Sequence, residues 1–145
     1  MIRSPICTVV GHIDHGKTTL LDRIRNTKIA KGEAGGITQA ISSTKISLEA
    51  IKRTCGNLLN TMKINFTIPG ILLIDTPGHA AFNNMRKRGG NLADIAILVV
   101  DAHQGMQEQT LESINILRQY KTPFILALNK VDLIDGWRSG TSGLL

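Results

Sequence analysis

The chain has little of several features that would point to particular protein classes. Its 145 residues include only two cysteines, so a disulfide scaffold is excluded. No apolar run approaches the roughly 20 residues that a membrane-spanning helix needs, and nothing at the N-terminus reads as a signal peptide. Aromatic residues make up 3% of the chain, which leaves little surface for stacking single-stranded bases. We therefore expect one cytoplasmic, monomeric domain with free thiols and no membrane contact.

Positive charge, in contrast, is in excess. Lys and Arg number 17 against 11 Asp and Glu, which makes the formal net charge +6 and the pI about 9.7. Such a surface favours a polyanionic partner such as RNA, contacted mainly through phosphates. A solvated basic surface of no special meaning explains the same composition, so both interpretations stay open.

Short apolar runs alternate with helical patterns along the chain. Buried strands are expected at 6–10, 95–100 and 124–128, a short apolar strand at 71–74, and a strand of alternating pattern at 44–48. Helices are expected at 17–29, 48–62 (with a break at Gly56) and 107–120, and a Gly-rich loop at 31–40. This order predicts an α/β fold with a mostly parallel sheet and helices on both faces. Ligands of such sheets bind at the carboxyl ends of the strands.

The apolar spacing within two of these helices also predicts which side faces the sheet. In the first helix the inward positions are expected to be Leu20, Leu21 and Ile24. In the last helix they are expected to be Leu111, Ile114 and Leu117. Cys7, within the first apolar run, is expected to be a small core residue.

The first motif follows the first strand and reads Gly-His-Ile-Asp-His-Gly-Lys-Thr over residues 11–18. It matches G-x-x-x-x-G-K-[ST], a loop whose backbone N–H groups surround phosphates. Gly11 and Gly16 let the backbone turn tightly, and Lys17 lies between the β- and γ-phosphates. Thr18 supplies a hydroxyl ligand to Mg²⁺, and Thr19 reaches the α-phosphate.

A glycine-containing turn between a strand and a helix is the plain alternative for this loop. Lys17 at the start of a helix opposes the helix dipole, which favours a bound anion opposite it. The loop as a whole, His12 and His15 included, is therefore expected to contact nucleotide. As side chains, however, His12, His15 and His103 are interpreted as ordinary loop or surface histidines.

The second motif, Asp75-Thr-Pro-Gly-His79, follows another apolar run. Asp75 is placed to hold Mg²⁺, through water, since Mg²⁺ keeps several waters. Gly78 can donate its backbone N–H to the γ-phosphate, and His79 is then placed to orient the attacking water. On its own, Asp75 would be interpreted as a turn aspartate.

The third motif is Asn129-Lys-Val-Asp132, which follows the last apolar run. Asp132 can accept two hydrogen bonds from N1–H and N2–H₂ of guanine, which adenine does not offer. Asn129 is expected to contact the base edge and hold the phosphate loop, while the stem of Lys130 packs on the purine face. All three motifs come at strand ends, so the sequence predicts binding of GTP and GDP with Mg²⁺.

Thr38 lies in the Gly-rich segment Gly35-Gly-Ile-Thr38. It can supply a second hydroxyl to Mg²⁺ when a γ-phosphate orders that segment, which would make an order–disorder switch. A flexible surface loop is the alternative, and spacing alone does not select Thr38.

Together with Gly36-Ile-Thr38, these motifs resemble those of the translational GTPases. More narrowly, the chain resembles the initiation factor 5B family of archaea and eukaryotes, a relative of bacterial initiation factor 2. The segments that carry this resemblance are 32–39, 86–90, 122–124 and 129–132, and 48–70 is similar to an insertion of that branch. The resemblance extends from about residue 6 to residue 137.

The resemblance implies a GTPase that promotes joining of ribosomal subunits and is stimulated by the large subunit. It implies contacts with ribosomal RNA and initiator tRNA through the full-length factor. In this family the histidine that matches His79 acts in hydrolysis, and the residues that match Ile13 and Ile37 form an apolar gate beside it. The aspartate that matches Asp14 is implicated in binding a monovalent cation, K⁺ or Na⁺, next to the phosphates.

The chain also departs from the family pattern. Ala80 stands where the family usually has Glu, which we expect to alter the effector surface more than the chemistry. The Ser-Ala-containing guanine loop and the last strand and helix do not appear before Leu145. We therefore expect residues 1–145 to be a partial GTP-binding domain, with 124–128 as an exposed apolar edge.

Two functional alternatives follow from these departures. The chain is either a GTP-hydrolysing module or a nucleotide-binding fragment without useful catalysis. An adenine-specific kinase conflicts with the motif at 129–132. The basic triplet Arg86-Lys-Arg88 is interpreted as a contact for ribosomal RNA or an effector domain rather than as a solvated helix face.

Overall fold

The computed structural model describes residues 2–25, 42–75 and 93–138. Within these ranges no helix combines the length and apolar character needed to cross a membrane. The elements, in chain order, are β1 (Ile6–Gly11), α1 (Lys17–Arg25), β2 (Ser42–Ser47), α3 (Leu48–Thr61), β3 (Gly70–Asp75), β4 (Ile95–Asp101), α5 (Glu108–Gln119), β5 (Phe124–Asn129) and the 3₁₀ turn η2 (Val131–Leu133). Each predicted strand is present, which confirms the alternation of strands and helices.

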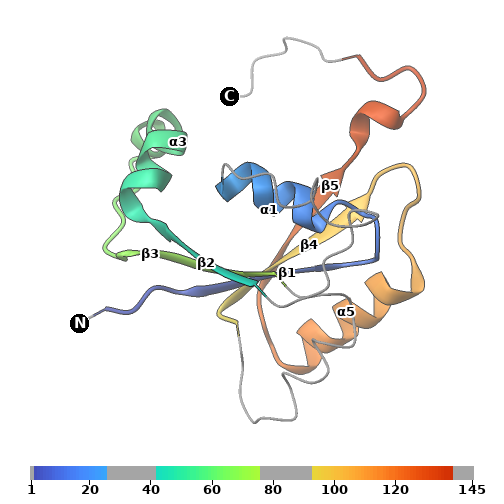
Figure 1. The fold of residues 1–145 in the computed structure, drawn as a ribbon, viewed down its shortest axis with the longest axis horizontal. Helices are drawn as coiled ribbons and strands as arrows, with labels where there is room; N and C mark the ends of the chain where they lie inside the picture. The colour runs from blue at the N-terminus through green and yellow to red at the C-terminus, as the bar shows by residue number, and fades with distance from the viewer. Residues whose placement is uncertain (1, 26–41, 76–92, 139–145) are drawn as a thin grey trace.

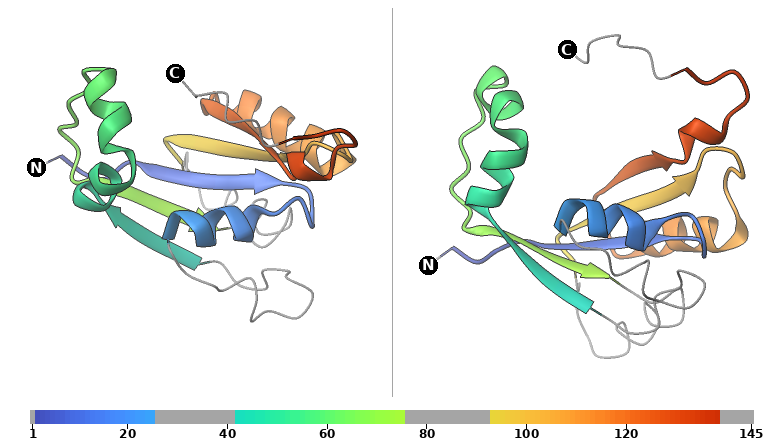
Figure 2. Two further views of the ribbon diagram at one scale, coloured as in Figure 1. Left: turned by 90° about the horizontal axis from the view of Figure 1, so that it is seen from above. Right: turned by 45° about the horizontal axis from the view of Figure 1, so that its top comes forward.

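The five strands form one sheet in the order β2-β3-β1-β4-β5. β1 pairs in parallel with β3 and β4, and β4 pairs in parallel with β5. β2 is antiparallel to β3, although the connection between them, residues 48–69, is long and contains α3. Helices α1 and α5 cover opposite faces of the sheet (Figures 1 and 2). The predicted α/β fold, mostly parallel and covered on both faces, is therefore confirmed.

The core consists of two clusters, one on each face of the sheet, because alternate residues of a strand point in opposite directions. Under α1, Leu21 packs with alternate residues of three strands: Cys7, Val9, Leu73 and Val99. On the other face, Leu117 of α5 packs with Val10, Ala96, Leu98 and Val100. Cys7 is a free, buried thiol, and burial raises its pKa to about 11. It is the small core residue that the sequence predicted.

The predicted inward faces of the two covering helices are only partly correct. Ile24 is 43% exposed and Leu111 is 51% exposed, although both were expected to face the sheet. In α5 the predicted Leu117 is buried, but the buried side also includes Thr110, Ser113 and Ile116, which were not predicted. Ser113 tolerates burial because its hydroxyl donates to the carbonyl of Gln109 at 2.8 Å. Polar residues thus occupy part of the inward side, which an apolar count does not detect.

Helix α3 continues through Gly56, so the predicted break there is wrong. Glycine lowers helix propensity by about 1 kcal/mol relative to alanine but keeps its backbone N–H, so the hydrogen-bond ladder is not interrupted. The helix begins cleanly because the Ser47 hydroxyl accepts from the N–H of Ala50 at 3.2 Å. No residue of α3 is buried.

Strand β5 lies at one edge of the sheet. Its apolar side chains are largely exposed: Phe124 by 39%, Ile125 by 55%, Leu126 by 50% and Leu128 by 59%. The expectation of an exposed apolar strand at 124–128 is confirmed for the part of the chain that the structure describes.

One leucine-to-alanine and one isoleucine-to-alanine substitution on α1 distinguish its buried side from its exposed side. Leu21→Ala should lower the free energy of unfolding by about 2–5 kcal/mol, because it leaves a cavity between α1 and the sheet. Ile24→Ala, on the same helix, should cost about 1 kcal/mol or less. Urea unfolding of both variants measures the difference, and equal losses would contradict the described orientation of α1.

Candidate functional site

The carboxyl ends of the parallel strands bring two of the predicted motifs and the start of a third to one edge of the sheet. Register places Val9 beside Asp75, Gly11 beside Val99, and Asp101 beside Asn129. The phosphate loop, Asp75 and Asn129 therefore lie next to one another although they are far apart in sequence. Edges of this kind are where α/β sheets bind ligands.

Both glycines of the phosphate loop have a positive φ and leave no room for a Cβ, Gly11 against backbone and Gly16 against a side chain. Gly11 has a φ of +144°, and a Cβ there would lie 2.3 Å from the carbonyl oxygen of Val99. Gly16 has a φ of +88°, and its Cβ would lie 2.2 Å from Nδ2 of Asn129. Any side chain at Gly16 would therefore push the third motif away from the first.

The phosphate loop is held in place from two sides. Nδ2 of Asn129 donates to the carbonyl oxygen of His15 at 2.9 Å, which is the contact between Asn129 and the loop that the sequence predicted. On the other side, the N–H of Ile13 donates to Oε1 of Gln109 on α5 at 3.3 Å. Sequence analysis gave no signal for Gln109, because it lies in an ordinary helical pattern.

Lys17 begins α1 with its side chain turned back over the loop. The residue is only 9% exposed, and its Nζ donates to the carbonyl oxygen of His12 at 2.6 Å. Burial lowers the pKa of Lys17, while the carboxylates of Asp75 and Asp14 oppose that change. A buried ammonium ion is stabilised further by an anion, so this position suits a phosphate group.

Thr18 and Asp75 place two buried side-chain oxygens close together, both of a kind that can coordinate a metal ion. The Thr18 hydroxyl lies 3.4 Å from Oδ2 of Asp75, and the two residues are 7% and 1% exposed. Hydroxyl and carboxylate oxygens are ligands that Mg²⁺ accepts, so the chemistry of this pair fits the predicted ion. Thr19 and Asp14 are exposed, Asp14 with a φ of 62°.

One histidine of the loop is more buried than an ordinary loop histidine. His15 lies in the loop, as one of the two predicted placements has it, but it is fully buried and not at the surface, whereas His103 is exposed. The His15 ring meets that of His12 edge-on, with ring centroids 5.0 Å apart. Burial, and then the neighbouring His12, lowers the pKa of His15. A loop that curls over the strand ends turns one of its own side chains inward, which a linear pattern does not reveal.

Asp101, at the end of β4, is a site residue that the sequence analysis missed. Its Oδ2 lies 2.9 Å from Nζ of Lys130, and its side chain is 2% exposed. Its Oδ1 accepts from the N–H groups of His103 and Gln104 at 2.9 and 3.1 Å. The hydrogen bond from Lys130 is the main reason that the pKa of Asp101 is lowered to about 2. The sequence could have indicated Asp101, because it directly ends a buried apolar strand, as Asp75 does.

The third motif is shaped by an unusual backbone at Lys130, whose φ is 57°. This conformation starts the turn η2, closed by the N–H of Leu133 donating to the carbonyl of Lys130 at 3.0 Å. Asp132, within η2, is exposed, so its carboxylate is accessible to a ligand. The ion pair with Asp101 fixes the ammonium end of Lys130. This is compatible with the prediction that the Lys130 stem packs on a purine.

Several predicted site residues lie outside the described residues. They are Ile37, Thr38, Gly78, His79, Ala80 and the triplet 86–88. Their roles, and the nucleotide-binding roles assigned to the other motif residues, stay predictions.

Asp101→Asn should destabilise the fold in a pH-dependent way. The folded-state pKa of about 2 lies below the ordinary 3.8, so the carboxylate contributes stability at neutral pH that is lost as the pH falls toward 2. The difference in free energy of unfolding between wild type and variant should therefore shrink from about pH 7 to about pH 2. Urea unfolding across this range measures it, with the exposed Asp135→Asn as control. A difference independent of pH would contradict the role of the ion pair.

Comparison with known proteins agrees with this geometry. The family described as "Elongation factor Tu GTP binding domain" matches residues 3–141. The "Probable translation initiation factor IF-2" of Methanopyrus kandleri is 59% identical over 138 residues, which is 95% of this chain and 23% of that protein. The corresponding protein of Thermococcus sibiricus is 58% identical over 137 residues, again 23% of its length.

Solved structures lead to the same group. GDP-bound aIF5B from Aeropyrum pernix matches with a TM-score of 0.77 and 48% identity, covering 97% of this chain and 23% of that chain. The chain thus spans about a quarter of the length of these relatives. The resemblance to translational GTPases of the initiation factor type is confirmed, and the chain belongs to the family of elongation factor Tu-type GTP-binding domains.

Proposed function

We propose that this chain is the GTP-binding and GTP-hydrolysing module of a translation initiation factor that promotes joining of ribosomal subunits. The hydrogen bond from Asn129 to the carbonyl of His15 carries the proposal. It joins the motif expected to read the base to the loop expected to hold the phosphates, so both ends of one nucleotide would be bound by a single connected unit.

The phosphate end of the proposed site consists of the loop backbone, Lys17 and the start of α1. The N–H groups at the helix start and the Lys17 ammonium favour the β- and γ-phosphates. Mg²⁺ would be held by Thr18 and Asp75, with Thr38 as the additional ligand in the GTP state. Bound Mg²⁺ supplies charge neutralisation between the two phosphates. Asp14 is proposed as a ligand of a monovalent cation, K⁺ or Na⁺.

The base end of the proposed site consists of Asn129, Lys130 and Asp132. Asp132 would accept hydrogen bonds from guanine N1–H and N2–H₂, and adenine would leave that carboxylate unpaired. Asp101 keeps the Lys130 ammonium at one end, which leaves the aliphatic stem available to pack on the purine.

Hydrolysis is proposed to depend on His79, with Gly78 contacting the γ-phosphate and Lys17 stabilising charge on the transferred group. Ile13, which is 37% exposed at the edge of the loop, and Ile37 are proposed as the gate that controls access of His79. A fragment that binds nucleotide without useful turnover is the alternative. This alternative is favoured by the exposed apolar side chains of β5, because that strand leads directly into the guanine motif.

The proposed partners are the large ribosomal subunit, ribosomal RNA and initiator tRNA, engaged through the full-length factor in the cytoplasm. Support comes from the translation factors to which the chain is similar and from the basic net charge of +6. The fragment itself is proposed to be monomeric.

Asp132→Asn should shift preference from guanine to xanthine nucleotides, because the amide can donate to the xanthine O2. Affinity for GDP should fall at least roughly tenfold, while affinity for XDP rises. Competition binding with GDP, XDP and ADP measures this, with exposed Asp135→Asn as a control that should keep GDP preference. An unchanged preference for GDP in Asp132→Asn would contradict the assignment of Asp132 to guanine recognition.

His79→Ala should remove ribosome-stimulated hydrolysis without affecting binding. The isolated wild-type chain should turn over GTP at roughly 10⁻⁴ s⁻¹ or below, the order found for GTPases without an activator. In the full-length factor with ribosomes, turnover should rise, and His79→Ala should abolish most of that gain at nearly unchanged GDP affinity. Equal rates for both full-length proteins on ribosomes would show that another group positions the water.

A further inference from the structure

Helix α3 and the segment that follows it form a surface far from the nucleotide edge. The helix begins where β2 ends, and the N–H of Leu48 donates to the carbonyl of Pro69 at 3.2 Å, directly before β3 starts. It therefore lies at the amino ends of the parallel strands, opposite to the phosphate loop. Figures 1 and 2 show α3 standing away from the sheet at that end. We call α3 together with residues 62–66 the α3 surface.

The α3 surface exposes several large apolar side chains that a helix packed on its own domain would bury. No residue of α3 is buried, although Ile51, Cys55 and Leu59 recur at helical spacing. Beside them, large apolar side chains are open to solvent: Leu58 by 51%, Met62 by 58%, Ile64 by 39% and Phe66 by 38%. A helix of this length is marginal in water on its own, so a covered apolar side would stabilise it.

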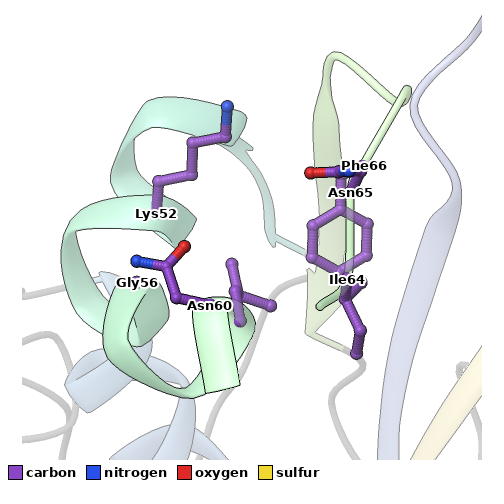
Figure 3. Close-up of a pocket in the computed structure, with 7 residues that line it drawn as sticks. Lys52, Gly56, Asn60, Ile64, Asn65 and Phe66 are labelled. Carbon is purple, nitrogen blue, oxygen red and sulfur yellow. The ribbon is translucent and has the colours of Figure 1, made fainter. Parts of the chain in front are cut away.

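A hollow lies between the helix and the segment that follows it. Its volume is about 340 Å³, and Figure 3 shows Lys52 and Asn60 on the helix side with Ile64 and Phe66 on the other. Gly56 lines the hollow, and a Cβ added there would meet nothing within 4 Å. The hollow therefore has a mixed lining, with Leu59, Ile64 and Phe66 as its apolar side chains and Asn60 and Asn65 as amides that can bind a peptide backbone.

Positive charge lies on this surface, since Lys52 lines the hollow and Arg53 and Lys63 belong to the same α3 surface. Lys52, Arg53 and Lys63 are all exposed, and no ion pair involves them within the described ranges. Glu49 is the sole acidic residue of the segment 48–66. The charge complement of this surface is therefore acidic.

We propose that the α3 surface docks an acidic amphipathic segment of a partner protein. Apolar side chains of that segment enter the hollow between Leu59, Ile64 and Phe66, and its carboxylates meet Lys52, Arg53 and Lys63. This is helix-in-groove or extended-peptide recognition with apolar anchors and a charged rim. The proposal goes beyond nucleotide binding, because no group of the phosphate loop or guanine motif takes part in it.

Nucleic acid fits this surface less well than an acidic peptide. RNA would use the basic side chains, but the exposed aliphatic groups of Leu58, Met62 and Ile64 have no base-stacking role. Phe66 is the one aromatic residue of the segment 48–66, whereas single-stranded nucleic acid sites use several stacking platforms. Burial of aliphatic side chains instead contributes free energy only with an apolar partner.

Fluorescence anisotropy on the full chain tests the proposal with three labelled probes. One is a synthetic amphipathic peptide with Leu at helical spacing and Glu elsewhere, the second has Lys in place of Glu, and the third is a single-stranded RNA. The Glu peptide should bind, and should bind more tightly than either of the other probes. Its affinity should fall as salt rises, because part of it comes from exposed charge.

Two variants locate the binding. Gly56→Leu should weaken the Glu peptide about tenfold or more, because the new side chain fills the hollow. The helix should persist, since leucine favours helix more than glycine. Lys52→Glu should weaken it several-fold, whereas Arg118→Glu, the same charge change at an exposed position of α5, should not.

GDP affinity of every variant is measured alongside and should stay at the wild-type value. Loss of GDP binding in the wild-type chain would count against the proposed function and not against the α3 surface. The docking proposal is overturned if the Glu peptide does not bind, if Gly56→Leu binds it as wild type does, or if Arg118→Glu and Lys52→Glu weaken it equally. Tighter binding of RNA, lost in Lys52→Glu, would assign the surface to nucleic acid instead.

Discussion

The hydrogen bond between the Asn129 side chain and the carbonyl of His15 joins segments that are 114 residues apart. It forms only because residue 16 is glycine, since a Cβ there would overlap the Asn129 amide. On its phosphate side, it fixes the loop that turns His15 inward and leads into α1. On its base side, it fixes the end of β5 and the start of η2. The arrangement of the whole nucleotide edge therefore depends on this one contact.

The parallel sheet makes that contact possible. Four parallel strands end at the same edge, and the last residues there are Gly11, Asp75, Asp101 and Asn129, three of which carry polar side chains. Both carboxylates are almost fully buried, and their surroundings differ. Asp75 meets the Thr18 hydroxyl, whereas Asp101 holds an ammonium group and caps a turn. Similar sequence positions thus have distinct chemistry: one carboxylate suits a metal ion, and the other positions Lys130.

The two ends of the sheet differ in which side chains they bury and which they expose. At the carboxyl ends of the parallel strands, the polar residues Lys17, Thr18, Asp75 and Asp101 are buried close together. At the opposite end, α3 presents exposed apolar and basic side chains around a hollow of about 340 Å³. A single fold can therefore carry the proposed nucleotide site and the proposed docking surface, because the sheet separates them and each is formed by its own connections.

Local pattern in the sequence determined the strands, the motif positions and the family, because each depends on residues that are close together in the chain. Apolar runs predicted all five strands, and the spacing within 11–18 and 129–132 predicted the site edge. Only the tertiary structure decided which sides of the covering helices are buried, so Ile24 and Leu111 proved exposed. The burial of His15 and the ion pair between Asp101 and Lys130 were likewise decided there. Both depend on segments that the sheet brings together from distant parts of the chain, and such proximity leaves no mark on local spacing.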